Sequence, residues 1–116
     1  MPNQPPEAKP IYRGIHAGHH RWTEALAGIA MPGDPEGHED AELHNDGATR
    51  GSRFTSWTHR RAVAEMYAGA GGLLLEWTTG KPPEGSGWRF EWSPDPFGEQ
   101  EVLICGTLVG AWVTQL

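Results

Sequence analysis

The chain has few of the features that mark an oxidising compartment, a membrane or a nucleic-acid partner. Its single cysteine, Cys105, leaves no partner for an internal disulfide. No apolar run approaches the roughly 20 residues that cross a bilayer, and the first residues lack the regions of a signal peptide. There is no basic stripe, and the formal net charge is −6, which argues against binding to nucleic acid by counterion release. We therefore predict a soluble chain without a leader, and no membrane partner.

Length and composition favour one small domain rich in turns. The chain has 116 residues, which suffice for a single core. It contains 16 glycines and 10 prolines, which suit short elements better than a helical bundle. Its six tryptophans could each bury roughly 150–250 Å². Residues 1–10 are predicted to be a flexible, proline-rich tail or linker, and residues 11–116 a single domain.

Apolar spacing predicts two helices. In residues 19–30 the side chains of Trp22, Leu26 and Ile29 recur at helical spacing, with Ala25 beside them. A second helix is predicted over 59–70, capped by Thr58 and ended by two glycines at 71–72. The residues predicted to line the apolar face of the second helix are Val63, Met66, Tyr67 and Ala70.

Strands are predicted at both ends of the chain, which indicates an α+β fold. The predicted strands cover 11–14, 54–57, 73–77, 88–92, 99–105 and 108–113, with Gly106 near the last turn. Alternation places Trp88, Phe90 and Trp92 on one face. Residues 79–87 and 93–98 are predicted loops. Residues 31–52 have no period, so they form a mobile or functional loop, or include a short helix near 41–44.

Three short segments carry side chains suited to chemistry. Glu99 and Glu101 share one face of a strand, where two carboxylates about 7 Å apart repel by roughly 2 kcal/mol at an effective dielectric of about 20. Arg13 offers a fork of donors that suits phosphate or carboxylate. Ser56 lies at a strand-to-helix junction. Each feature alone has a simpler interpretation: a solvated strand edge, a surface ion pair and a turn residue.

Taken together, these segments resemble the arginine–serine–glutamate class of ADP-ribosyltransferases, which includes many bacterial toxins. The matching motifs are Tyr12-Arg13-Gly14, Ser56-Trp57-Thr58, and Glu99-Gln100-Glu101 followed by apolar residues. The resemblance covers roughly residues 10–114. Two departures are visible. Trp57 and Thr58 replace the middle threonine and the last serine of the class's Ser-Thr-Ser motif, and the helical lobe that precedes the core in larger toxins is absent or very short.

The resemblance implies a fold and a set of roles. The fold would be an ADP-ribosyltransferase-type core of two small, packed, mainly antiparallel sheets with one or two flanking helices. Glu101 would stabilise the positive ribosyl centre that forms as NAD loses nicotinamide, and Ser56 would orient it. Glu99 would act on the acceptor as a general base. The NAD-binding residues would be Arg13, Tyr12, Gly14, Ser56, Trp57 and Thr58.

The resemblance also implies partners. NAD would be the co-substrate, and an arginine side chain of a protein is the favoured acceptor, in keeping with a toxin or effector domain that other machinery delivers to a target cytoplasm. An immunity or antitoxin protein is a further partner in this interpretation. Water, a small molecule or a nucleic acid are alternative acceptors for the same site. A degenerate, non-enzymatic binding module is the remaining alternative, and the Arg13, Ser56 and Glu101 set argues against it.

Several other side chains have competing interpretations. Phe97 and Trp92 lie in or next to the loop before Glu99 and are predicted to recognise the target, although core packing is favoured slightly for Trp92. The histidines at 16, 19, 20, 38 and 44 show no standard metal spacing, so no metal site is predicted. His16 is a candidate for lining the NAD pocket. Cys105 lies in an apolar strand and is expected to pack as a small hydrophobe.

Overall fold

The computed structural model describes residues 9–41, 44, 51–78, 87–92 and 101–116, and it has the predicted α+β class. A six-stranded sheet has the order β5-β6-β3-β1-β4-β8, and β2 and β7 form a second sheet. All of these strands pair antiparallel. The six strands are β1 (Pro10–Ile15), β3 (Phe54–Thr58), β4 (Leu73–Thr78), β5 (Arg89–Trp92), β6 (Glu101–Cys105) and β8 (Trp112–Gln115). The other elements are β2 (Ile29–Ala30), β7 (Leu108–Val109), α1 (Trp22–Leu26) and α3 (Arg61–Ala68).

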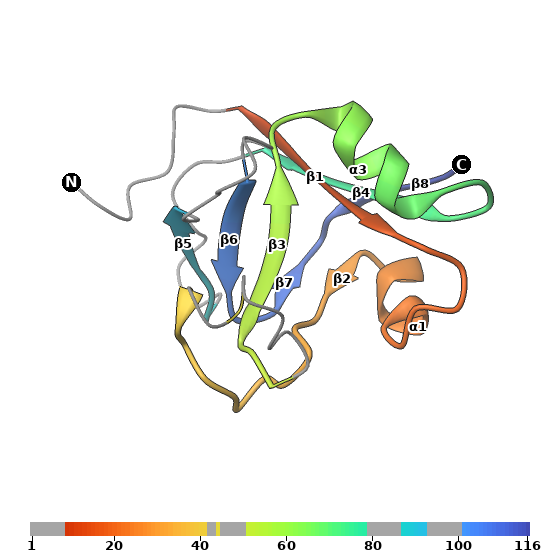
Figure 1. Ribbon diagram of the computed structural model, residues 1–116. Helices are drawn as coiled ribbons and strands as arrows, with labels where there is room; N and C mark the ends of the chain where they lie inside the picture. Colours follow the sequence, from red (N-terminus) through yellow and green to blue (C-terminus); the bar gives the residue numbers. More distant parts are fainter. Residues whose placement is uncertain (1–8, 42–43, 45–50, 79–86, 93–100) are drawn as a thin grey trace.

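The main core lies between one face of the large sheet and the segments that carry α1, β2 and β7 (Figure 1). Ile11, Leu75 and Val102 of the large sheet belong to the same buried cluster as Ala30 of β2 and Leu108 of β7. Alternation along the strands explains this arrangement, because odd-numbered residues of β1 and β4 share that face. The two sheets are therefore packed against each other, as predicted.

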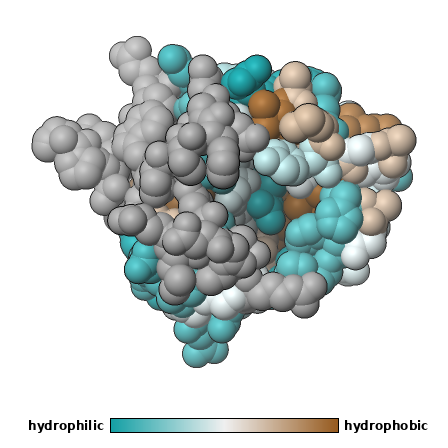
Figure 2. Space-filling model, viewed as in Figure 1, coloured by the Kyte–Doolittle hydropathy of each residue, from teal (hydrophilic) through white to brown (hydrophobic). Residues whose placement is uncertain are grey.

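Helix α3 covers the opposite face of β1 (Figure 1). Its buried residues are Val63, Ala64 and Ala68, whereas Met66 is 67% exposed and Tyr67 57%. The predicted apolar face was therefore wrong apart from Val63. The reason lies at Gly14, where a Cβ atom would stand 2.0 Å from the carbonyl oxygen of Ala64. Small residues face β1 because the backbones touch. Figure 2 shows hydrophobic residues gathered over the outer surface of α3.

The ends of α3 also differ from the prediction. The N-cap residue is Arg60, and Thr58 Oγ1 instead accepts a hydrogen bond from the Arg60 N–H at 3.0 Å. The C-cap is Gly69, whose φ of 68° lies in the left-handed region that glycine adopts without steric strain. The helix thus ends at Ala68, two residues before the predicted end at residue 70.

The first predicted helix is much shorter than residues 19–30. Helix α1 ends at Leu26, which is 52% exposed, and Ile29 pairs with Val109 in the second sheet. Gly28 breaks the helix with φ of 78°. Its carbonyl oxygen accepts hydrogen bonds from the N–H groups of Gly110 and Ala111. The tertiary contact with the last segment of the chain therefore overrides helical spacing.

The late strands lie in the predicted region, but one predicted strand is in fact two strands. The described part of strand β6 begins at Glu101, and residues 99 and 100 of the predicted strand lie outside the described residues. The predicted strand over 108–113 is two strands, β7 and β8, which belong to different sheets. Gly110 separates them with φ of 93°. Gly106 lies in the turn after β6, as predicted, with φ of 102°.

The described part of residues 31–52 has a defined course. The N–H of His38 bonds to the carbonyl of Gly51, and the N–H of Arg53 bonds to the carbonyl of His38. Ala41 and His44 have helical backbone, which agrees with the predicted alternative of a short helix. The Glu39 carboxylate lies 2.7 Å from Arg53 Nη1 and 2.8 Å from Arg89 Nη2, and these ion pairs tie the segment to the sheet.

Some predictions fall on residues that the structure does not describe. These are the loops over 79–86 and 93–98, and the tail over 1–8. Strand β1 begins at Pro10, the last residue of the predicted tail. Trp88 and Phe90 belong to one buried cluster, which agrees with the predicted shared face, and the Trp92 side chain lies outside the described part. Among the helices of the described residues, none is long and apolar enough to cross a membrane.

Candidate functional site

The site forms where β1 and β3 separate. Although the two strands are neighbours in the sheet, they pair only at Tyr12 and Thr58, whereas β1 pairs with β4 along its whole length. Arg13 follows Tyr12 directly and lies on the same side of β1 as the core residues Ile11 and Ile15. The separation of the strands gives the guanidinium a route out of the core, toward Ser56.

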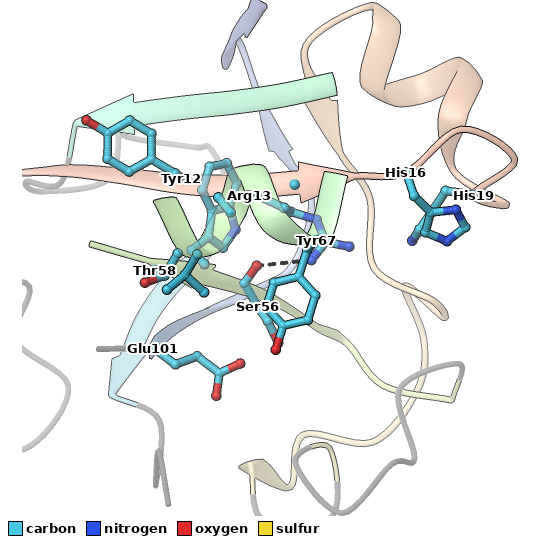
Figure 3. A pocket seen from close by; sticks show the side chains of 12 residues that line it. Tyr12, Arg13, His16, His19, Ser56, Thr58, Tyr67 and Glu101 are labelled. Atoms are coloured by element: carbon cyan, nitrogen blue, oxygen red, sulfur yellow. Dashed lines mark hydrogen bonds between the residues drawn. The ribbon is translucent and has the colours of Figure 1, made fainter. Parts of the chain in front are cut away.

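A cavity of about 320 Å³ occupies this region. It is bordered by residues of β1, β3, α3 and β6 and of the segment after β1 (Figure 3). Its lining residues are Tyr12, Arg13, Gly14, His16, His19, Ser56, Trp57, Thr58, Val63, Ala64, Tyr67 and Glu101. Ligand pockets usually span about 300–1,000 Å³, so the cavity has the size of a small-molecule site.

Arg13 is a partly buried cation at the wall of the cavity. Its Nη1 donates a hydrogen bond to the backbone carbonyl of Ser56 at 3.0 Å (Figure 3). Its Nε is buried and has no hydrogen-bond partner among the described residues. Burial lowers the pKa of Arg13 to about 10, and the negative charge of Glu101 opposes that shift. The guanidinium therefore remains charged at neutral pH, with donor capacity for an anionic group.

Glu101 faces the same cavity from the first position of β6. Its Cα pairs with that of Thr58, and the Cα of Leu103 pairs with that of Ser56. Paired residues share a face, so Glu101 and Ser56 are diagonal neighbours on one side of the sheet. Figure 3 shows the Glu101 side chain extending into the region below Ser56 and Tyr67. The carboxylate, the serine and the guanidinium therefore lie around one cavity.

A buried histidine holds Ser56. His44 is 4% exposed, and its Nε2 lies 2.8 Å from Ser56 Oγ. Its Nδ1 lies 2.8 Å from Ser52 Oγ, which also accepts a hydrogen bond from the Phe54 N–H. Burial, followed by the charges of Arg13 and His38, lowers the pKa of His44 to about 4. The imidazole is therefore neutral at pH 7, with one donor and one acceptor nitrogen.

The positions of the protons in the hydrogen-bonded series Ser52–His44–Ser56 can be assigned from Ser52. Its hydroxyl is fully buried, and His44 Nδ1 is the acceptor within reach among the described residues. A Ser52 O–H that donates to Nδ1 leaves the histidine proton on Nε2, where it donates to Ser56 Oγ. The hydroxyl proton of Ser56 then remains available to a group in the cavity. Ser56 is thus arranged as a donor toward the side on which Glu101 lies.

The neutral state of His44 predicts a pH-dependent stability. Because the pKa of His44 falls from 6.5 in the unfolded chain to about 4 in the fold, the unfolded chain binds more protons between these values. Stability is then lost as the pH falls through this window, by about 3 kcal/mol in total. We expect the difference in unfolding free energy between the wild type and His44→Gln to shrink by about this amount from pH 7 to pH 4. Urea denaturation measures it, and a constant difference would contradict the assignment.

Most of the predicted site residues border this one cavity. They are Tyr12, Arg13, Gly14, Ser56, Trp57, Thr58 and Glu101, together with His16. Trp57 differs from the others, since it is 1% exposed and its Nε1 donates to Thr55 Oγ1 within the core. Glu99, Phe97 and the side chain of Trp92 lie outside the described residues, so their predicted roles stay predictions.

Sequence reasoning missed three residues of the site: His44, Tyr67 and His19. Tyr67 was assigned to the apolar face of its helix, yet it lines the cavity. His19 also borders it, and burial, with neighbouring positive charges, lowers its pKa to about 4. A second hollow of about 210 Å³ adjoins the cavity and shares Arg13, His19 and Ser56 with it. A histidine within an irregular segment gives no periodic signal, so only tertiary contacts could identify His44.

The histidines that follow β1 form a cluster of rings, and Cys105 packs in a hydrophobic cluster. The ring of His19 contacts those of His16 and His20, with centroids 5.3 and 4.5 Å apart respectively. Within the described part of the chain, no group of three or more His, Cys, Asp or Glu residues could hold a metal ion. Cys105 is buried beside Phe54 and Leu103, which confirms its predicted packing role.

Comparison of the chain with protein-family models, with curated proteins and with solved structures found no match. The geometry of the site is therefore the basis for a functional assignment.

Proposed function

We propose that this chain is a mono-ADP-ribosyltransferase that transfers ADP-ribose from NAD to an arginine side chain of a protein and releases nicotinamide. The observation that carries the proposal is the meeting of Arg13, Ser56 and Glu101, from three distant segments, around one cavity. These are the residues on which the resemblance to the arginine–serine–glutamate class rests. The two packed antiparallel sheets and the helix after the serine motif support the same assignment at the level of architecture.

The proposed reaction breaks the bond between nicotinamide and C1′ of the ribose. The bonding electrons leave with nicotinamide, and positive charge develops on the ribosyl ring. A nitrogen of the acceptor guanidinium forms the new bond to C1′ and loses a proton, which the predicted general base Glu99 or a water molecule would take up. Glu101, held at the start of β6, would stabilise the developing charge more in the transition state than in the ground state.

The surrounding residues suit the other parts of NAD. Among the described residues the Nε of Arg13 has no hydrogen-bond partner. It is therefore a charged donor for a phosphate or ribose oxygen, and an anion would satisfy it. The Ser56 hydroxyl, fixed by His44, would donate to Glu101 or to a ribose hydroxyl. Tyr67 offers an aromatic ring at the side of the cavity. A planar base can stack on such a ring, and the cavity volume of about 320 Å³ suits the nicotinamide half of the molecule.

The proposal is tested with NAD labelled in its adenylate phosphate. We expect nicotinamide release and label on an arginine-rich protein, with much less label when the acceptor arginines are chemically blocked. Free labelled ADP-ribose alone would assign an NAD glycohydrolase, and label on nucleic acid would assign a different acceptor. Absence of nicotinamide release with every acceptor would contradict the proposal and favour a binding module.

A further inference from the structure

A second feature of the large sheet lies at its β8 end, away from the cavity. Strand β8 is the last strand of the sheet in the described part of the chain, and Trp112 opens it. Trp112 is 75% exposed, the largest exposed fraction among the large hydrophobic side chains described. An indole left in water gains nothing for the fold. An exposed aromatic of this kind is typical of a binding surface.

Trp112 borders an open hollow of about 370 Å³, which it shares with Glu76, Trp77, Thr78 and Gly110. The Cα of Trp112 pairs with that of Glu76, so the indole and the carboxylate are adjacent on one face. Trp77 is half-buried and is held by edge-to-face contact with Trp88, at 6.1 Å between ring centroids. At Gly110, a Cβ atom would stand 3.8 Å from Trp77 Cζ3. The hollow thus combines two indoles with one carboxylate.

The electrostatics of the hollow favour a cation. Glu76 forms no ion pair with any residue that the structure describes. The charge of Arg61 acts on Glu76, but Arg61 Nε already donates to Glu65 at 2.9 Å. The whole chain carries a formal net charge of −6, which attracts a basic partner. Planar guanidinium groups stack on indole rings and pair with carboxylates at the same time.

We propose that this hollow, which we call the Trp112–Glu76 site, binds an arginine side chain in a basic segment of the protein acceptor. The inference rests on the proposed function, because the bound segment would present a second arginine to the catalytic cavity. In this arrangement the indole of Trp112 stacks on the guanidinium, and the Glu76 carboxylate pairs with it. The site would raise the affinity for protein acceptors without taking part in the cleavage of NAD.

The register of the sheet links the Trp112–Glu76 site to the cavity. Trp112 pairs with Glu76, Glu76 with Tyr12, Tyr12 with Thr58 and Thr58 with Glu101. These five residues form one row across five strands, with their side chains on one face. Four strand spacings of about 4.8 Å place the Cα atoms of Trp112 and Glu101 roughly 19 Å apart. An extended peptide of about six residues covers that span.

Binding alone tests the site independently of catalysis. A fluorescein-labelled hexa-arginine peptide is titrated in the absence of NAD, and its anisotropy is measured. We expect Trp112→Ala to weaken binding about two- to five-fold, the range of an exposed cation–aromatic contact. Glu76→Gln should weaken it by up to about five-fold, the range of an exposed ion pair. Glu36→Gln removes the same charge at another exposed position, and Leu26→Ala removes another exposed apolar side chain. Wild-type affinity in Trp112→Ala, or equal weakening in Glu36→Gln and Glu76→Gln, would overturn the inference.

Transfer then tests the role of the site. Trp112→Ala is expected to raise the KM for an arginine-rich protein about two- to five-fold, while the rate of NAD hydrolysis by water is unchanged.

A peptide whose two arginines are six residues apart should be modified faster than one with adjacent arginines. Equal rates for the two peptides would contradict the spanning arrangement. A wild-type protein that binds the peptide but releases no nicotinamide would instead refute the proposed function and leave the binding result intact.

Discussion

Replacement of Glu101 by glutamine is expected to reduce nicotinamide release from NAD at least about 100-fold, while the fold is retained. The amide has nearly the shape of the carboxylate but no negative charge, so stabilisation of the positive ribosyl centre is lost. Removal of one electrostatic group of this kind typically lowers kcat by about 10²–10³. The measurement is single-turnover release of labelled nicotinamide at saturating NAD, which separates the chemical step from binding.

The matched control for this prediction is Glu36→Gln, the same chemical change at an exposed position outside the cavity. It should keep the wild-type rate. Near-ultraviolet circular dichroism and the thermal midpoint should show that Glu101→Gln is folded, because Glu101 lies at the end of a strand and is only half-buried. Nicotinamide release at the wild-type rate in a folded Glu101→Gln protein would remove Glu101 from its proposed role.

Gly14→Ala is expected to destabilise the protein by about 3 kcal/mol and to disturb the cavity at the same time. The new Cβ would meet the carbonyl oxygen of Ala64 at 2.0 Å and the backbone nitrogen of Ala68 at 2.8 Å. Both neighbours are backbone atoms of α3, which cannot turn aside as a flexible side chain can. Overpacking typically costs about 1–3 kcal/mol, and at this chain length 3 kcal/mol lowers the thermal midpoint by roughly 10 °C.

The control for Gly14 is Gly51→Ala. Gly51 is exposed, and a Cβ atom there would find no heavy atom of the described residues within 4 Å. Its unfolding free energy should therefore change by less than about 1 kcal/mol. If Gly14→Ala melts at the wild-type temperature, the close packing of α3 on β1 is not a requirement of the fold. The NAD-cleavage activity of Gly14→Ala should also fall, because α3 carries three lining residues of the cavity, Val63, Ala64 and Tyr67.

Local pattern accounts for much of the fold. Continuous apolar residues identified β4, alternation identified β5, and a glycine-bounded apolar segment identified α3. The failures occurred where distant contacts decide. Ile29 follows the spacing of α1 but joins β2, because its partner Val109 lies 80 residues later in the chain. Helix α3 packs its alanines closely against Gly14, and the larger side chain of Met66 lies on the exposed side of the helix. Periodicity contains no information about such partners.

The amino-acid sequence by itself determined which side chains could do chemistry, since the motifs around Arg13, Ser56 and Glu101 were identified without coordinates. It also determined the α+β class, through the order of its periodic segments. Only the tertiary structure decided that these side chains surround one cavity. The reason is physical: β1 separates from β3 after one pair, which turns Arg13 from a core position toward Ser56. Tertiary packing likewise buried His44 against Ser56. Local pattern does not encode this hydrogen bond, because it depends on how the two segments are brought together in the fold.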